Sequence, residues 1–144
     1  MTKPLKYIDN YHFGDKKVKY THYLLYENKM NVDGHKKKAK ELERSLNRLL
    51  PDPDGENVVA IVELTYGILL HLIAVGMETK YGRHLDTHVG LPRELRKVGE
   101  VDIAEIFEML DTFRAGRWYG SKGNGEVVER CLDFIKKVKE WATE

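Results

Sequence analysis

The chain of 144 residues carries 24 Lys and Arg against 23 Asp and Glu, and 42% of its residues are hydrophobic. This composition is typical of a soluble globular protein, and the formal net charge of +1 excludes a global field that attracts nucleic acid or membranes, so any anion site has to be local. The single cysteine, Cys131, excludes an internal disulfide and predicts a reducing, cytoplasmic location.

We interpret residues 1–32 as an N-terminal arm. Val18, Tyr20 and His22 alternate with other residues, which indicates a strand, but Leu25 interrupts the alternation and leaves the structure of the arm open. The first ten residues lack the apolar segment of a signal peptide. Glutamine is absent while Lys and Glu are abundant, a bias that is typical of proteins from thermophiles.

From Asp33 onward the apolar residues recur at helical spacing. Residues 33–144 are therefore predicted to form an all-α, up-and-down bundle of four to five helices. Asp33 is the predicted N-cap of the first helix, and the segment PDPDG ends it. Further helices are predicted at residues 57–81, 92–98, 102–118 and 126–142.

The longest of these helices contains the apolar run VVAIVELTYGILLHLIAVGM. The run is long enough to span a membrane, but Glu63 and His71 interrupt it, so we expect a helix in the middle of the bundle and no membrane. One narrow face carries its small and ionisable residues, which are Glu56, Ala60, Glu63, Gly67, His71, Ala74 and Glu78. This face is either a solvent- or dimer-facing stripe or a polar cleft lined by Glu63 and His71.

The stretch FRAGRWYGSKGNGE joins the last two long helices. Arg114 and Arg117 continue an apolar stripe, and because arginine keeps its proton, they need a carboxylate such as Glu63 or Glu78, or a bound anion. The glycine-rich loop and the next helix N-terminus complete a predicted phosphate site. Its residues are Arg114, Arg117, Tyr119, Lys122, Gly123, Asn124 and Glu63. The alternative is a tight turn in which Asn124 caps the last helix.

Two further groups of residues are candidate sites. The segment RHLDTH contains His84, Asp86 and His88 without a recognised zinc spacing, so we expect no metal and no cofactor, and these side chains are expected to bind the loop to the bundle. The first helix is rich in Lys and Arg, but Glu41 and Glu43 interleave with them. Pairing on a solvated face is therefore expected, with an RNA-backbone patch as the alternative.

The order of these segments resembles the HEPN domains of prokaryotes, over about residues 33–142. The resemblance is carried by HKKKAKELERSL, ELTYGILLHLIA and HLDTHVGLPRELRKVG, then a helix ending in FRAGRWYG and a closing amphipathic helix. It implies a helical bundle that forms a homodimer. Many such domains are metal-independent RNases of toxin–antitoxin or defence systems, and some have a nucleotidyltransferase partner.

The nuclease motif of that family is an Arg followed, after four to six residues, by a His. Arg114 matches the Arg, while Tyr119, Gly120 and Ser121 stand where the His would fall. Because that histidine is the usual general acid or base, the resemblance implies a module that binds RNA or a nucleotide rather than one that cleaves it. The alternatives are an endoribonuclease that uses Arg114 with His71, His84 or His88, and a structural protein–protein interaction module.

Overall fold

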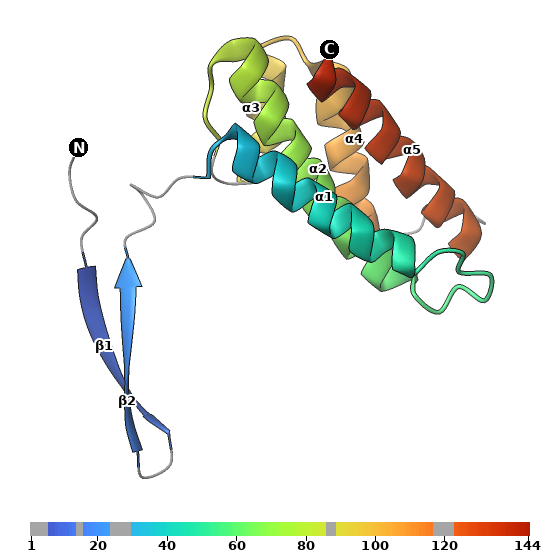
Figure 1. Ribbon diagram of the computed structural model, residues 1–144. Helices are drawn as coiled ribbons and strands as arrows, with labels where there is room; N and C mark the ends of the chain where they lie inside the picture. Colours follow the sequence, from blue (N-terminus) through green and yellow to red (C-terminus); the bar gives the residue numbers. More distant parts are fainter. Residues whose placement is uncertain (1–5, 14–15, 24–29, 86–88, 117–122) are drawn as a thin grey trace. The chain divides into compact units, whose positions relative to one another are not determined.

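The computed structural model describes residues 6–13, 16–23, 30–85, 89–116 and 123–144, and the chain divides into two units, Met1–Met30 and Asn31–Glu144. In the first unit, strands β1 (Lys6–Phe13) and β2 (Lys16–Tyr23) pair antiparallel (Figure 1). The alternation around Tyr20 thus corresponds to a strand, whereas Leu25 lies outside the described residues.

The second unit confirms the all-α prediction. Its described residues contain five helices, which are α1 (Val32–Arg48), α2 (Val58–Tyr81), α3 (Leu91–Lys97), α4 (Val101–Arg114) and α5 (Asn124–Thr143). The helix α2 lies at the centre and packs against α1, α4 and α5 (Figure 1). The short helix α3 packs mainly against α4.

Contacts along α2 define the directions of the other long helices. Near its start, Glu63 meets Arg114 at the end of α4, so α4 runs antiparallel to α2. Gly76 lies against Trp141 near the end of α5, so α5 runs parallel to α2. The long helices therefore alternate in direction along the chain, as an up-and-down bundle requires.

The core is built around the apolar surface of α2. Ile61, Ile68, Leu69 and Ile73 are fully buried, and α4 and α5 add Leu110 and Val138 to the same core. Among the described helices, α2 is the one that is long and apolar enough to cross a membrane. However, 61% of its most apolar window is buried inside the helical unit, as in a core helix, so its length is weak evidence for a membrane.

Three helix ends differ from the sequence prediction by two residues or more. Asn31, not Asp33, is the N-cap of α1, because its side chain accepts a hydrogen bond of 2.8 Å from the amide of Gly34. Helix α4 ends at Arg114 instead of residue 118, since Gly116 adopts a positive φ of 75° just after it. Helix α5 begins at Asn124, two residues before the predicted start.

The loop between α1 and α2 is ordered by its own acidic residue. Asp52 accepts hydrogen bonds from both the backbone amide and the side-chain amide of Asn57, at 3.0 and 3.1 Å. Asn57 is the residue just before α2. The PDPDG segment therefore ends α1, as predicted, and also positions the start of α2.

Candidate functional site

Arg114 and Glu63 form the ion pair around which the candidate site is built. Arg114 is the last residue of α4, and its Nε lies 3.2 and 3.1 Å from the two carboxylate oxygens of Glu63 on α2. The Arg114 side chain is 40% exposed and that of Glu63 is 49% exposed, so both remain within reach of a ligand. The hydrogen bond to Glu63 raises the pKa of Arg114, which keeps the guanidinium charged.

The guanidinium of Arg114 packs on the ring of Tyr66, and that ring packs in turn against Phe107. The Cζ atom of Arg114 lies 4.2 Å from the ring centroid of Tyr66, which is 7% exposed and lies 5.1 Å from the ring centroid of Phe107. Burial raises the pKa of the Tyr66 hydroxyl, so it remains protonated at neutral pH. Arg114 is thus held by a carboxylate and by a cation–π contact, and it presents a fixed positive charge at the surface.

An open pocket of about 340 Å³ adjoins this arginine. Tyr66 and Phe107 supply its apolar lining, together with Pro92 at the start of α3, while Arg114 shares the polar part with Asp111 and Glu108. The volume falls in the usual range of about 300–1,000 Å³ for small-molecule sites. Its two carboxylates lower the attraction that Arg114 exerts on an anion, so the pocket suits a ligand that also offers hydrogen-bond donors.

His71 belongs to a second cluster, separate from Arg114. Its Nδ1 lies 2.9 Å from Nδ1 of His35, a buried residue of α1. One of these two nitrogens has to carry a proton and the other has to be free of one. Burial, followed by the charges of His35 and Lys38, lowers the pKa of His71. Since His71 follows Glu63 by eight residues, its Cα lies about 12 Å further along the helix axis than that of Glu63.

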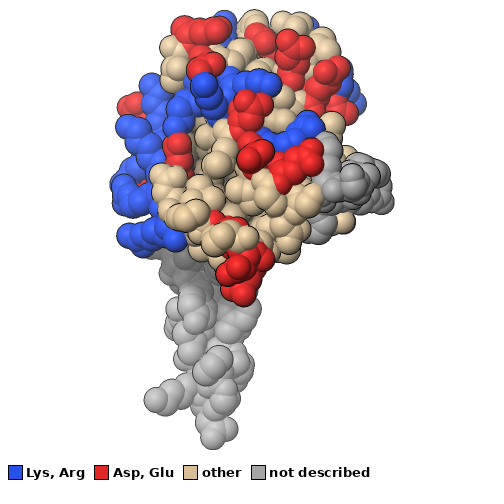
Figure 2. All heavy atoms as spheres, turned by 90° about the vertical axis from the view of Figure 1, so that its right-hand side faces the viewer, with Lys and Arg blue, Asp and Glu red and all other residues tan. Residues whose placement is uncertain are grey.

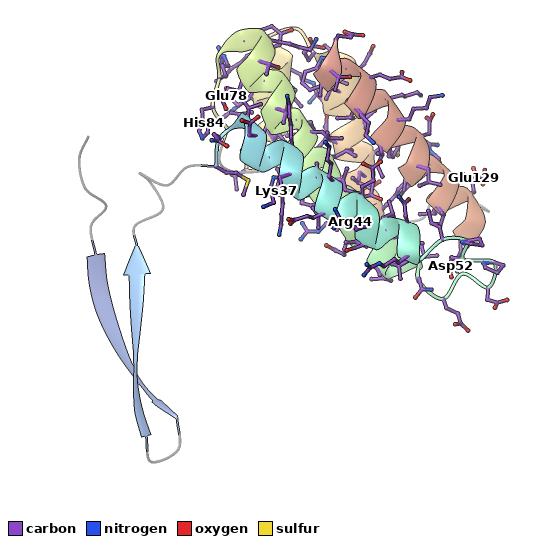
Figure 3. All side chains as sticks on the ribbon, viewed as in Figure 1. Lys37, Arg44, Asp52, Glu78, His84 and Glu129 are labelled. Carbon is purple, nitrogen blue, oxygen red and sulfur yellow. The ribbon has the colours of Figure 1, made fainter. Side chains whose placement is uncertain are left out.

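The loop after α2 folds back onto this histidine cluster. His84 Nδ1 lies 3.0 Å from a carboxylate oxygen of Glu78, and both residues are labelled in Figure 3. The rings of His84 and His35 are 6.4 Å apart between centroids. His84 therefore binds the loop to α2, in line with the expectation for RHLDTH. His88 and Asp86 lie outside the described residues.

The polar face of α2 is divided between the two clusters. Ala60 and Glu63 are exposed, whereas Gly67 lies under α1, where an added Cβ would come within 3.0 Å of Leu42 Cδ1. His71 is half-buried and Ala74 is buried. The face is therefore neither wholly solvent-facing nor a continuous cleft that joins Glu63 to His71.

The predicted phosphate site around the glycine loop falls partly outside the described residues. This applies to Arg117, Tyr119 and Lys122. Gly123 is the residue just before α5, and Asn124 is the first helical residue, so the interpretation of Asn124 as N-cap is wrong. The side-chain amide of Asn124 instead donates a hydrogen bond of 3.3 Å to the carbonyl of Gly55, which attaches the α1–α2 loop to α5.

In the part of the chain that the structure describes, no group of three or more His, Cys, Asp or Glu side chains is arranged to hold a metal ion.

The described candidate site consists of Arg114 with Glu63, Tyr66 and Asp111. Sequence reasoning named the first two but missed the others. Tyr66 follows Glu63 by three residues and Asp111 precedes Arg114 by three, and this one-turn spacing was the signal that pointed to them.

His35 was also missed by the sequence interpretation. It occupies the buried face of α1 at helical spacing with Ala39 and Leu46, so its apolar neighbours on the helix were the available signal. A histidine in such a position faces a neighbouring element, and here it faces His71.

No family model, curated protein or solved structure matches this chain. The resemblance to HEPN domains accordingly rests on the order of its segments and on the residues around Arg114.

Proposed function

We propose that the helical unit is a HEPN-like module that binds RNA or a nucleotide, with Arg114 as the contact to phosphate. The observation that carries this proposal is the anchoring of Arg114 by Glu63 and Tyr66 beside an open pocket. An arginine whose side chain is already ordered loses less entropy when it binds a phosphate. The pocket gives space for the sugar or base attached to that phosphate.

The acidic neighbours of Arg114 shape the ligand that this proposal implies. Asp111 and Glu108 line the same pocket, and Glu63 occupies one edge of the guanidinium. An isolated phosphate is repelled by these carboxylates, while a nucleotide can donate hydrogen bonds to them from its base or its ribose hydroxyls. The site therefore favours a nucleotide unit of RNA over inorganic phosphate. Gly123 and the loop residues Arg117, Tyr119 and Lys122 remain part of the proposed binding surface.

The second candidate function is a metal-independent endoribonuclease, and one observation favours it. Glu63 touches Arg114, so a group able to accept a proton stands next to a cation able to stabilise a developing negative charge. His71 is the less suitable partner for Arg114. It contacts His35, and it lies about two helical turns further along α2 than Glu63. In this version Glu63 replaces the missing motif histidine.

We propose a homodimer as the functional form, in the cytoplasm and with a nucleotidyltransferase as a further partner. The exposed start of α2 supports the homodimer, because Val59 is 68% exposed next to the small residue Ala60. Val59→Lys is expected to weaken the dimer in sedimentation without entering the core. Gly67→Leu is a poor test, because an added side chain there meets Leu42 of the same chain. A structural interaction module would show this dimer and no RNA binding.

The experiment that tests the proposed function incubates the purified protein with labelled RNA in EDTA, beside Arg114→Ala and Glu63→Gln. A denaturing gel detects cleavage and filter binding detects retention. Retention without cleavage, lost in Arg114→Ala, supports the binding module. Cleavage that both variants abolish favours the endoribonuclease. If the native protein neither retains nor cleaves RNA, both functions are wrong and the structural module remains.

A further inference from the structure

A second surface of the helical unit carries unpaired positive charge. Five exposed cations of α1 make up what we name the α1 basic row: Lys36, Lys37, Lys40, Arg44 and Arg48. At about 100° per residue they fall within about 120° of one another, on the side of the helix opposite the buried Ala39 and Leu46. From Lys36 to Arg48 the row extends about 18 Å along the helix axis.

The acidic residues of α1 do not neutralise this row. Glu41 lies 3.9 Å from Lys38, and Glu43 pairs with Lys139 of α5. Within the described residues, no carboxylate stands at ion-pair distance from any of the five cations of the row. The pairing expected from the i,i+4 spacing is therefore wrong for these five side chains, and their charges face solvent.

Figure 2 shows Lys and Arg gathered on the left of the helical unit, the side to which the turn from Figure 1 brings α1. Lys37 and Arg44 are labelled on this helix in Figure 3. The exposed acidic residues of α4, by contrast, recur at three-residue intervals from Asp102 to Asp111. The exposed cations of α1 and the exposed carboxylates of α4 thus form two separate charged surfaces, although the net charge of the chain is only +1.

The composition of this surface favours a polyanion over a protein or a membrane. Large apolar side chains that are exposed in the described residues include Val59, Val89 and Met109, and none of those identified belongs to α1. Protein interfaces have an apolar centre, and membrane-lying helices insert an apolar face. A row of Lys and Arg without exposed apolar residues offers charge alone, which is what a chain of phosphates recognises.

We propose that the α1 basic row is a track for the phosphate backbone of a single-stranded RNA. Each of its five cations, spread over about 18 Å, can neutralise one phosphate, so the row can make up to about five phosphate contacts. A groove of about 280 Å³ between α1 and α5 lies beside it. Its lining combines the apolar Leu46, Leu132 and Ile135 with polar and charged side chains, which are Glu43, Asn47, Lys136, Lys139 and Glu140. A base that projects from the strand can pack its face against the apolar residues of this groove. This inference rests on the proposed function and identifies the surface that carries the RNA backbone.

The test measures how salt weakens the binding of a short labelled poly(U) RNA, by fluorescence anisotropy on the full chain. With five phosphate contacts, the logarithm of the affinity is expected to fall with the logarithm of salt concentration at a slope of about −3.5. In the double variant Lys40→Gln, Arg44→Gln the slope is expected to be about −2.

A matched control removes two exposed lysines elsewhere, through Lys97→Gln and Lys137→Gln on α3 and α5. Its slope should equal that of the native protein. Circular dichroism verifies that each variant keeps its helical content, as expected for exposed positions.

Each outcome decides between the two proposals. An equal slope in the α1 variant and the control overturns the track, and if Arg114→Ala then loses the RNA, the proposed function stands without it. A reduced slope in the α1 variant supports the track even if Arg114→Ala binds normally, in which case Arg114 is not the phosphate contact. If the native protein does not bind the RNA, the track is wrong, and so is RNA as the ligand of the proposed function. If the α1 variant dissociates a dimer with an unchanged slope, the row is a protein contact and the track is wrong.

Discussion

Arg114 and Glu63 are 51 residues apart in the chain, yet Arg114 Nε lies 3.1 and 3.2 Å from the carboxylate oxygens of Glu63. The pair connects the end of α4 to the start of α2. Both side chains are more than a third exposed, so solvent screens the attraction and the pair is expected to add only about 0–1 kcal/mol to stability. The arrangement therefore does more to orient the arginine than to hold the bundle together.

Glu63→Gln is the variant that separates orientation from charge. It keeps the shape and one acceptor oxygen but removes the negative charge beside Arg114. If Arg114 contacts phosphate, we expect the variant to bind RNA several-fold more tightly at low salt, because a like-charge neighbour of the ligand is gone. The free energy of unfolding should change by less than about 1 kcal/mol. Anisotropy and urea denaturation measure the two quantities. Weaker binding in this variant would contradict a phosphate contact at Arg114.

Asp52→Ala is expected to destabilise the entry to α2. Asp52 accepts two hydrogen bonds from Asn57, and their loss is expected to lower the free energy of unfolding by about 1–2 kcal/mol. Asp54→Ala is the matched control, because Asp54 is an exposed aspartate of the same loop. Urea denaturation followed by circular dichroism compares the two variants. Equal effects would mean that the hydrogen bonds to Asn57 do not stabilise the loop.

Gly76→Ala tests the contact between α2 and α5. An alanine inside a helix is normally favoured over glycine by about 1 kcal/mol. Here, however, the added Cβ would lie 2.3 Å from the ring of Trp141, so we expect a net loss of about 1–3 kcal/mol from overpacking. Gly125→Ala is the control, since that glycine of α5 has no such atom within 4 Å. Thermal denaturation should move the two melting temperatures in opposite directions, and a stabilised Gly76→Ala variant would contradict this packing.

The histidine pair makes stability depend on pH in the mildly acidic range. The pKa of His71 is lowered in the folded protein, mainly by burial, while in the unfolded chain it is about 6.5. The unfolded state therefore binds the proton more readily. The contribution of His71 is present above pH about 6.5 and is lost as pH falls through the lowered pKa.

The variant His71→Gln checks this dependence. The free energy of unfolding of the native protein should decrease from pH about 7 to pH about 5 more steeply than that of the variant. Both proteins keep His84 and Glu78, so the contribution of that second pair cancels in the comparison. Parallel pH curves would show that His71 does not titrate on unfolding in this range.

The sequence by itself was sufficient for the all-α class and for the existence and order of the helices. The apolar periodicity of segments such as residues 124–143 can be read from neighbouring residues alone, and a helix with one continuous apolar face can bury that face only against other elements. The sequence also named Glu63, with Glu78 or a bound anion as alternatives, as a partner for Arg114, since an arginine on an apolar stripe needs a carboxylate or an anion. The helix ends were less predictable, because neighbouring residues such as Asn31 and Asp33 compete for the same cap.

The tertiary structure alone decided which distant groups meet. His71 faces His35 and not Arg114, because α1 crosses α2 at that level and leaves only the start of the polar face open. In the described part of the chain, no carboxylate lies at ion-pair distance from the five cations of the α1 basic row. The two glutamates of α1 pair instead with Lys38 and with Lys139, which belongs to another helix. Helical periodicity fixes the direction in which a side chain leaves its own helix. The neighbour that it meets depends on how the helices pack around α2, and that arrangement results from the burial of all their apolar faces together.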